Sequence, residues 1–401
     1  MEVTWWWLLT VPLFFGLGWV AAHLDARQLF SDTRALPASY FAGLNHLLND
    51  RPEQAIASFE EVARLDPDTA DLYFALGKLF RGRGEIERAI RIHRNLLERA
   101  DLPQAQRELA LFSLAQDYLK AGIFDRAESA FASLADTGYA VRAQRELARL
   151  YEKESNWPAA IDAVQGYIKG VRESHKGSSN DAPSELILAK QDLAHYACEL
   201  AALCLQSGVY EPAQHAIDLA RASDASNPRI DIYLAQLQFK NDQPTLAIQT
   251  LDACVKRSSA LATIATQSVL QALSPAELPE TTLAKLIEWT QIRPHIDVIR
   301  QILPLLQDER YAGERLALQN ALADSLKQSP ISLTAASAVL AEAAAGSAQS
   351  DVWRAQVQTA LKSLGAKIDK PVCSFCGFKA SRHHWRCPGC ARWNTLPYAA
   401  Q

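Results

Sequence analysis

Glycine and net charge are both scarce in this sequence, and each shortage narrows the classes of protein that fit it. Only 17 of the 401 residues are glycine, against roughly 7% in an average protein, while alanine and leucine abound. This composition favours helices. The 41 lysines and arginines nearly balance the 45 aspartates and glutamates, for a formal charge of −4. A protein that coats nucleic acid needs surplus cations to displace counterions, so no nucleic-acid partner is expected.

Catalytic signatures are missing as well. The sequence has no nucleophile–histidine–acid arrangement, no H-E-x-x-H motif and no phosphate-binding loop, so we do not expect an enzyme. Its seven cysteines are an odd number, which makes a poor disulfide framework and indicates a reducing compartment. Three of them occur singly in apolar helical patterns and are expected to be small buried hydrophobic residues: Cys198, Cys204 and Cys254.

Charge is absent from residues 3–22, which are apolar almost throughout. As a helix this segment would extend about 30 Å, enough to cross the hydrocarbon core of a bilayer. Tryptophans at both ends, Trp5 and Trp19 among them, suit the two membrane interfaces. A cleaved signal peptide would begin with positive charge, whereas the only early charged residue is Glu2. We therefore predict a retained transmembrane anchor at residues 1–23.

The charges that follow the anchor predict its orientation. Arg27 and Arg34 come after the apolar segment, and no lysine or arginine precedes it. By the positive-inside rule, the single-pass anchor leaves the bulk of the chain in the cytoplasm, which agrees with reduced cysteines. Residues 24–36 are then a juxtamembrane linker.

A helical repeat follows the linker. An alanine recurs at spacings mostly close to 34 residues, and twelve residues before each stands a glycine or alanine, which would let two helices approach closely. The marker alanines are Ala55, Ala89, Ala127, Ala160, Ala213 and Ala247. This pattern resembles the tetratricopeptide repeat, most completely in residues 43–67 and 73–101. Six helical hairpins are predicted in residues 37–258.

The predicted fold class is all-α, a superhelical solenoid of tetratricopeptide repeats with a transmembrane helix before it and a small metal module after it. The widest repeat spacing contains a polar insert at residues 170–183, which is expected to be a mobile loop. The helical pattern continues through residues 259–365, where the repeat markers blur, and degenerate repeats are predicted there.

A solenoid acts through the surface that its first helices line, so the sequence predicts a binding module. In the second repeat, aromatic and basic residues fall on or beside that surface and are candidate partner-binding residues for an anionic or acidic partner: Phe74, Lys78, Arg81, Arg88 and Arg91. The alternative, a solvated helix face, is the commoner meaning of such a charge run. His93 occupies a core position, which favours a buried, hydrogen-bonded histidine over a ligand.

Four cysteines near the C-terminus form two C-x2-C pairs: Cys373, Cys376, Cys387 and Cys390. Each pair can present two thiolates to one tetrahedral ion, so residues 366–401 are predicted to bind one metal. The pairs resemble rubredoxin knuckles and zinc ribbons, but only ten residues separate them, and Ala391 stands where rubredoxin has glycine. Both departures argue against an electron-transfer iron, so a closed structural zinc site is favoured, with iron as the alternative.

The metal module carries a surplus of cations and two tryptophans, Trp385 and Trp393. Counted with four thiolates and a divalent ion, its charge is about +3. Two uses of the tryptophans stay open. They could grip a nucleic acid or an acidic protein, or they could pack this small module onto the last solenoid helices.

Three segments together carry a resemblance that covers essentially the whole chain: residues 77–93, residues 117–128, and the W-R-C-P-x-C motif at residues 385–390. They resemble the lipopolysaccharide assembly protein B family of Gram-negative bacteria. Residues 170–183 and 261–350 look divergent from it. The resemblance implies an inner-membrane, cytoplasm-facing adaptor without catalysis of its own.

The resemblance also implies partners. Such adaptors work with a membrane-anchored ATP-dependent zinc protease to promote degradation of the deacetylase that commits a sugar precursor to lipid A. A lipopolysaccharide-sensing membrane regulator can oppose them. The alternatives are a rubredoxin-like redox protein, and an assembly scaffold that contacts lipopolysaccharide export proteins. Homo-oligomerisation is left open.

Overall fold

The computed structural model describes residues 41–65, 70–175, 184–274, 278–292, 296–306, 309–318 and 370–397, apart from single positions or pairs at 44, 47–48, 50 and 381. It divides into two compact units, Met1–Leu150 and Tyr151–Gln401. No helix among these residues is long and apolar enough to cross a membrane. The predicted anchor at residues 1–23 and the linker at 24–36 lie outside the described residues.

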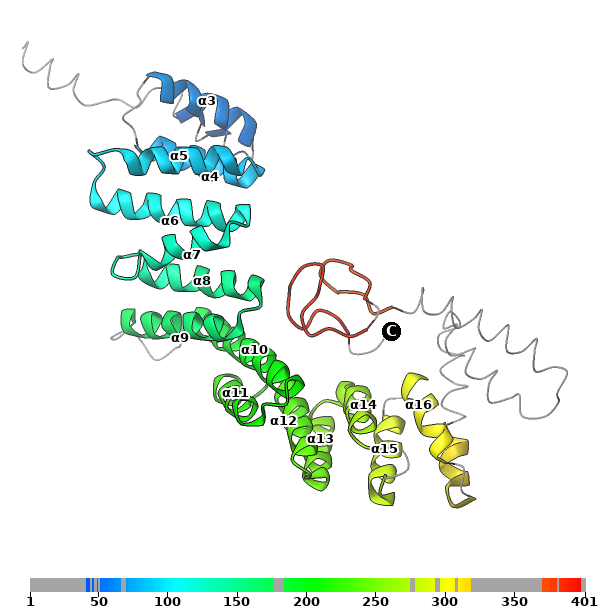
Figure 1. Ribbon diagram of the computed structural model, residues 1–401. Coiled ribbons are helices and arrows are strands. Elements are labelled where there is room, and N and C mark those ends of the chain that lie inside the picture. The colour runs from blue at the N-terminus through cyan, green and yellow to red at the C-terminus, as the bar shows by residue number, and fades with distance from the viewer. Residues whose placement is uncertain are drawn as a thin grey trace, which may run out of the picture. The chain divides into compact units, whose positions relative to one another are not determined.

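The first unit is a series of antiparallel helices joined by short turns (Figure 1). They are α3 (Pro52–Leu65), α4 (Ala70–Arg83), α5 (Ile86–Glu98), α6 (Gln104–Ala121), α7 (Phe124–Ala132) and α8 (Ala140–Glu154), whose last residues belong to the second unit. The helices from α3 to α7 each pack on the next one in sequence, and α4 also packs on α6, as expected for stacked hairpins. α6 ends at Gly122, whose φ of 76° provides the left-handed cap that a side chain would strain.

The second unit contains the helices α9 (Trp157–Ser174), α10 (Ser184–Gln206), α11 (Tyr210–Ser223), α12 (Arg229–Lys240) and α13 (Pro244–Arg257). The following described helices are α14 (Ala262–Ala272), α15 (Glu280–Ile292) and α16 (Ile296–Ile302), with short 3₁₀ turns at Ser259–Leu261, Leu303–Leu305 and Glu309–Tyr311. The predicted all-α repeat solenoid is confirmed. The division into six repeats and a degenerate region stays a prediction.

Burial follows the repeat pattern closely. All six marker alanines are fully buried. The small residue that precedes each marker serves the close approach of helices, because a Cβ on Gly77 would collide with the ring of His93, and one on Gly43 with the ring of Phe59. His93 is buried, as its core position predicted.

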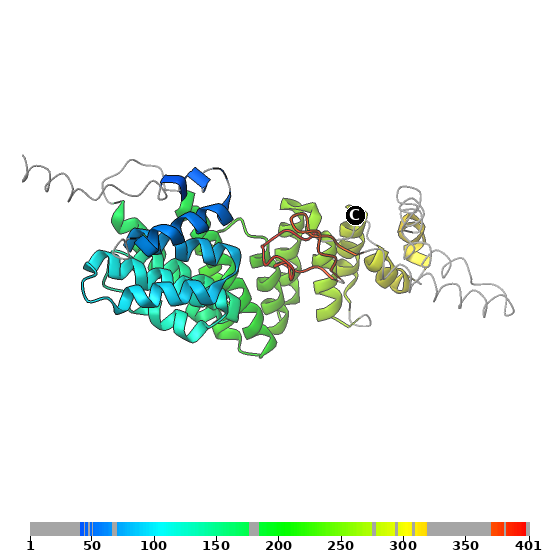
Figure 2. The ribbon, with the colours of Figure 1, turned by 90° about the horizontal axis from the view of Figure 1, so that it is seen from above.

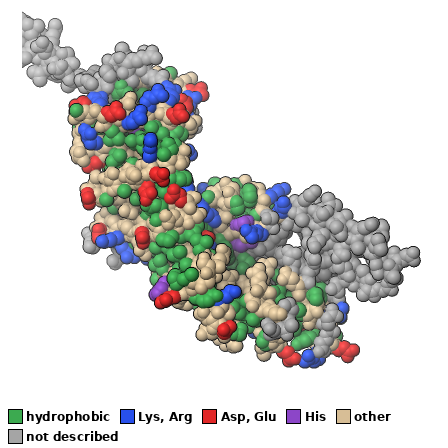
Figure 3. Space-filling model, viewed as in Figure 1, with side chains coloured by type: hydrophobic (Ala, Val, Ile, Leu, Met, Phe, Trp, Pro, Cys, Tyr) green, Lys and Arg blue, Asp and Glu red, His purple; other side chains and the backbone are tan. Residues whose placement is uncertain are grey.

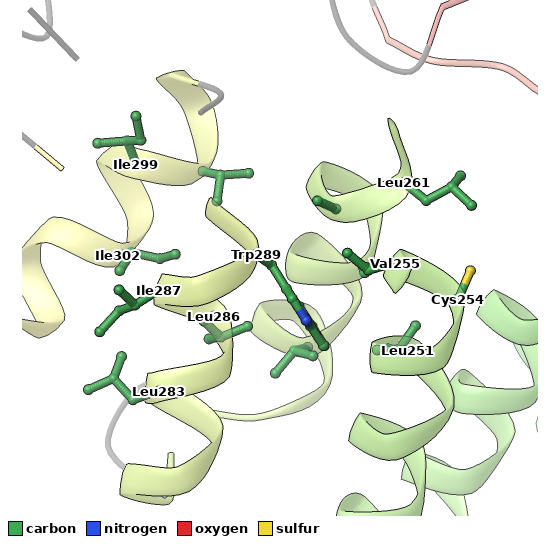
Figure 4. Packing of buried hydrophobic residues seen from close by; sticks show 14 of the residues in the cluster. Leu251, Cys254, Val255, Leu261, Leu283, Leu286, Ile287, Trp289, Ile299 and Ile302 are labelled. Atoms are coloured by element: carbon green, nitrogen blue, oxygen red, sulfur yellow. The ribbon is translucent and has the colours of Figure 1, made fainter. Parts of the chain in front are cut away.

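The C-terminal part of the described solenoid has a continuous hydrophobic core. Figure 4 shows Trp289 of α15 reaching toward Leu251 and Val255 of α13. The tryptophan is fully buried, and its indole N–H donates to Asp252 at 3.1 Å. Residues beyond the six marker alanines therefore pack as one body with α13.

The three cysteines outside the metal module differ in burial. Cys198 and Cys254 are buried, and burial raises the pKa of each thiol to about 11, so both are inert hydrophobic residues as expected. Cys204 is only half-buried, so the expectation of a buried residue was wrong there. It lies in the last turn of α10.

Candidate metal centre and its contact with the repeat helices

The four-cysteine module consists of two knuckles with the same backbone. In the first, the Cys373 N–H donates to Phe378 at 2.9 Å, and in the second the Cys387 N–H donates to Arg392 at 2.9 Å. Antiparallel bridges close each knuckle at corresponding positions, Val372 with Lys379 and Arg386 with Trp393. This repetition brings the two cysteine pairs face to face.

The four sulfurs converge on one point. All lie within 4.8 Å of one another, with Cys373 to Cys390 at 3.8 Å and Cys376 to Cys387 at 3.7 Å. A tetrahedral ion with metal–sulfur bonds of about 2.3 Å requires sulfurs about 3.8 Å apart. The residues therefore fit one four-thiolate metal ion, as predicted. Zinc and iron share this donor set, and the geometry does not separate them.

Ala391 changes one sequence argument. Its φ is 57°, in the same left-handed region as Gly377 with 73°. Its N–H donates to the Cys387 carbonyl at 2.8 Å, matching the 3.0 Å bond from Gly377 to Cys373. The knuckle thus keeps its turn without glycine, at a cost of roughly 1–2 kcal/mol of backbone strain. The departure at Ala391 is therefore no argument against iron.

The environment of Cys373 favours the thiolate that a metal needs. Its Sγ lies 3.3 Å from the Thr395 hydroxyl. Hydrogen bonding to this hydroxyl, assisted by backbone N–H groups, lowers the pKa of Cys373 to about 6. The module has little core of its own beyond the cysteines, since the cluster around them adds just two small or medium side chains, Ala380 and Leu396. Its fold therefore depends on the metal and on contacts outside the module.

Contacts outside the module include those with α10 and α12 (Figures 1 and 2). The ring of Trp393 stacks on His195 of α10, with centroids 4.6 Å apart and planes 4° apart. Trp385 packs against the hydrophobic core of the C-terminal helices. Both tryptophans face the repeat helices, so of the two uses left open by the sequence, the structure shows packing.

Arg229 at the start of α12 is the charged centre of this contact. Its side chain is 0% exposed, and its guanidinium lies 5.3 Å from the Trp385 ring centre and 5.4 Å from that of Trp393. One terminal nitrogen donates to Glu199 at 2.6 Å and to the Tyr233 hydroxyl at 3.1 Å. Within the described part of the chain, Nε and Nη1 have no hydrogen-bond partner. The electron-rich faces of the indoles replace that hydration.

A second arginine fastens the edge of the module. Arg386, beside Cys387, pairs with Glu152 of α8 at 3.2 Å and donates to its backbone carbonyl at 3.3 Å. Glu152 also accepts a bond from the Tyr196 hydroxyl at 3.1 Å. Residues far apart in the sequence thus share one carboxylate, which fixes the orientation of the second knuckle.

His195 is held neutral by its surroundings. Burial, and then the charge of Arg229, lower its pKa to about 4, against a small opposing effect of Asp224. The Asn227 amide lies 3.3 Å from Nδ1 and can donate to it. A neutral imidazole is therefore the form that stacks on Trp393. His195 and Arg229 were not predicted from the sequence, because a single polar residue in an amphipathic helix belongs to no recognisable motif.

The candidate residues of the second repeat lie in the first unit. Arg81 pairs with Asp117 of α6 at 2.8 Å and also donates to the Ser113 carbonyl. Asp117 bonds His93 at 2.5 Å, and Phe74 stacks on the same histidine. Arg81 thus joins successive hairpins, whereas Phe74 packs within its own hairpin.

The remaining candidates of that repeat are at the surface. Lys78 and Arg91 are exposed. Arg88 pairs with Glu85 at 2.8 Å and covers the ring of Phe80. Cationic side chains also spread over the surface of the metal module (Figure 3). Partner binding by these residues stays a prediction.

Family models match both parts of the chain. The tetratricopeptide repeat model matches residues 42–110 and 112–175, and the rubredoxin metal binding domain model matches residues 372–397. Lipopolysaccharide assembly protein B of Escherichia coli strain K12 is 28% identical over 401 residues, covering 97% of this chain and 96% of the relative. The chain is thus similar to lipopolysaccharide assembly protein B over nearly its whole length. The sequence-based resemblance to that family is confirmed.

A second similar protein aligns over the same share of both chains. The protein of that name from Haemophilus influenzae strain Rd is 24% identical over 407 residues, and covers 97% of this chain and 96% of the relative. Among solved structures, the C-terminal part of a tetratricopeptide-repeat protein from Cytophaga hutchinsonii aligns with a TM-score of 0.43 at 11% identity, over 75% of this chain and 99% of that one.

Proposed function

We propose that the protein is a membrane-anchored, cytoplasm-facing adaptor of the inner membrane that regulates lipopolysaccharide synthesis. It would present the deacetylase that commits to lipid A to a membrane-anchored ATP-dependent zinc protease. A lipopolysaccharide-sensing membrane regulator would oppose it. The observation that carries the proposal is the similarity over 97% of the chain, because it includes the repeats and the metal module together.

The architecture supports an adaptor in physical terms. Repeat helices offer an extended binding surface. The metal module packs on these helices, because Trp393 contacts Arg229 and His195. A rigid module holds a partner in one orientation. A membrane tether would add effective concentration beside a membrane protease, without any further contact.

The metal has a structural role in this proposal. Bound by Cys373, Cys376, Cys387 and Cys390, it would supply cross-linking of the two knuckles. The chain's own residues attach the module to the helices, because the second knuckle places Trp393 against His195 and Arg386 against Glu152.

A rubredoxin-like redox protein is the alternative that one observation favours. Cys376 is exposed, so one ligand of the metal site reaches the surface. A purified protein that is red and bleaches reversibly on reduction would support this alternative, and a colourless protein with one equivalent of zinc would reject it.

The adaptor proposal is tested by the half-life of the deacetylase. Depletion of the protein should stabilise the deacetylase and raise lipopolysaccharide, and the full chain should restore both. Cys387→Ser should fail to complement, whereas Cys204→Ser, the same change in a half-buried cysteine outside the module, should complement. An unchanged half-life after depletion contradicts the proposal. An assembly scaffold for export proteins would instead alter lipopolysaccharide transport at a constant deacetylase level.

A further inference from the structure

A pocket between α9, α10 and α11 is not explained by repeat packing or by the metal module. Its volume is about 440 Å³, and it is open to solvent on one side. Ile168 and Leu193, both buried, form its apolar floor. Lys169, Arg172 and Lys190 stand at its rim. The pocket thus combines an apolar floor with a cationic rim.

The rim of the pocket carries a surplus of positive charge. One acid, Glu173, faces three cations. Within the described part of the chain none of the three forms an ion pair or a side-chain hydrogen bond, whereas other cations of the same unit do, such as Lys256 with Asp252 at 2.8 Å. A fixed surplus of positive charge around a concavity attracts an anionic group.

The pocket lies away from the metal module. On α10, Leu193 lines the pocket and His195 stacks on Trp393. Two residues along an α-helix differ by about 200° in direction, so they point to opposite sides. The module contacts one side of α10, and none of the residues that line the pocket on the other side belongs to the module.

An exposed apolar side chain lies beside the cationic rim. Ile187, 52% exposed, lies one helical turn before Lys190 on the same side of α10. Apolar surface beside a charged rim is typical of a protein interaction site. A flat lipid surface needs no concavity, whereas a peptide can insert a side chain into one.

We propose that this pocket binds a short acidic segment of a partner protein. Its carboxylates pair with Lys169, Arg172 and Lys190, and an apolar side chain rests on Ile168 and Leu193. The inference rests on the proposed adaptor function, since it gives the chemistry of one partner segment. It can fail while the deacetylase half-life still responds to depletion.

The test uses the full chain and a labelled synthetic peptide, Glu-Asp-Glu-Leu-Glu-Asp, with Gln-Asn-Gln-Leu-Gln-Asn as its uncharged counterpart. Fluorescence anisotropy should show binding of the acidic peptide alone, weakened by salt. The double variant Lys169→Glu/Arg172→Glu should raise the Kd at least about tenfold. The control Lys120→Glu/Lys153→Glu makes the same charge change at exposed positions outside the pocket and should leave the Kd within about twofold.

Three results overturn the inference. The acidic peptide does not bind the wild-type chain, the control variant weakens binding as much as the pocket variant, or the acidic and uncharged peptides bind equally. Mixed vesicles of phosphatidylethanolamine and phosphatidylglycerol, offered in place of the peptide, test a membrane surface. Vesicle binding that depends on Lys169 and Arg172, without peptide binding, replaces a protein partner by a lipid. Far-UV circular dichroism confirms that each variant is folded.

Discussion

The two cysteine knuckles share one backbone and have different surroundings. The first presents Phe375 and Phe378 to solvent, with the Arg392 guanidinium over the Phe375 ring. The second places Trp393 and Arg386 against α10 and α8. A metal would order both knuckles, whereas the contacts with the repeat helices, among the residues that the structure describes, come from the second knuckle and Trp385 just before it. Substitutions of aromatic residues in the two knuckles should thus have very different effects on stability.

The largest expected effect follows loss of a metal ligand. Cys387→Ser removes one of four thiolates and should forfeit much of the roughly 10–16 kcal/mol of apparent binding free energy of a structural zinc ion. Bound metal, measured by mass spectrometry of the purified chain, should fall from one equivalent to well below it. Cys204→Ser is the control. Full metal retention in Cys387→Ser would show that the four thiolates are not the site.

A smaller effect should follow loss of the buried guanidinium. Arg229→Ala removes the cation between Trp385 and Trp393 and leaves Glu199 without its partner, which should cost about 3 kcal/mol. Urea unfolding followed by tryptophan fluorescence measures this loss. The metal content should stay at one equivalent, because Arg229 contacts no cysteine ligand. Loss of the metal as well would mean that docking and metal binding cannot be separated.

Acid should weaken the same contact. The pKa of His195 is about 4 in the folded chain against an ordinary 6.5, so the unfolded state binds its proton first as the pH falls. This part of the stability is complete above pH 6.5 and decreases toward pH 4, by about 2 kcal/mol at pH 5. The difference in unfolding free energy between the wild type and His195→Gln, measured at pH 7 and pH 5, isolates it from titration of the thiolates. An equal difference at both pH values would contradict the assignment.

The smallest effect is expected in the exposed knuckle. Phe375 is 55% exposed, so Phe375→Ser should change the unfolding free energy by no more than about 0.5 kcal/mol. Trp393→Ser, in the docked knuckle, should cost several times as much. Equal costs in urea unfolding would remove the distinction between the two knuckles.

The features that could be predicted from the sequence are those that depend on the spacing of residues along the chain. The alanine markers gave the helical hairpins, and two C-x2-C pairs gave four converging sulfurs, because both patterns follow from local geometry. Gly77 was also predicted correctly as a small position for close helix approach, and His93 as a core position, but their contact with each other was not predicted.

Long-range contacts were not predictable in this way. Arg229 and His195 resemble ordinary helix residues until the second knuckle is placed against them. Arg81 was interpreted as a surface cation because its partner, Asp117, belongs to the next hairpin. Ala391 was treated as a departure, since a sequence does not show that alanine can be held at a positive φ.

Hydrogen exchange tests the central claim most directly, namely that the metal-ordered second knuckle is fastened to α10 and α12. Mass spectrometry of the full chain would compare the wild type with Cys387→Ser. We expect faster amide exchange in α10 and α12 around His195 and Arg229, with α4 and α6 of the first unit unchanged. Unchanged exchange in α10 and α12 after loss of the metal would contradict the account.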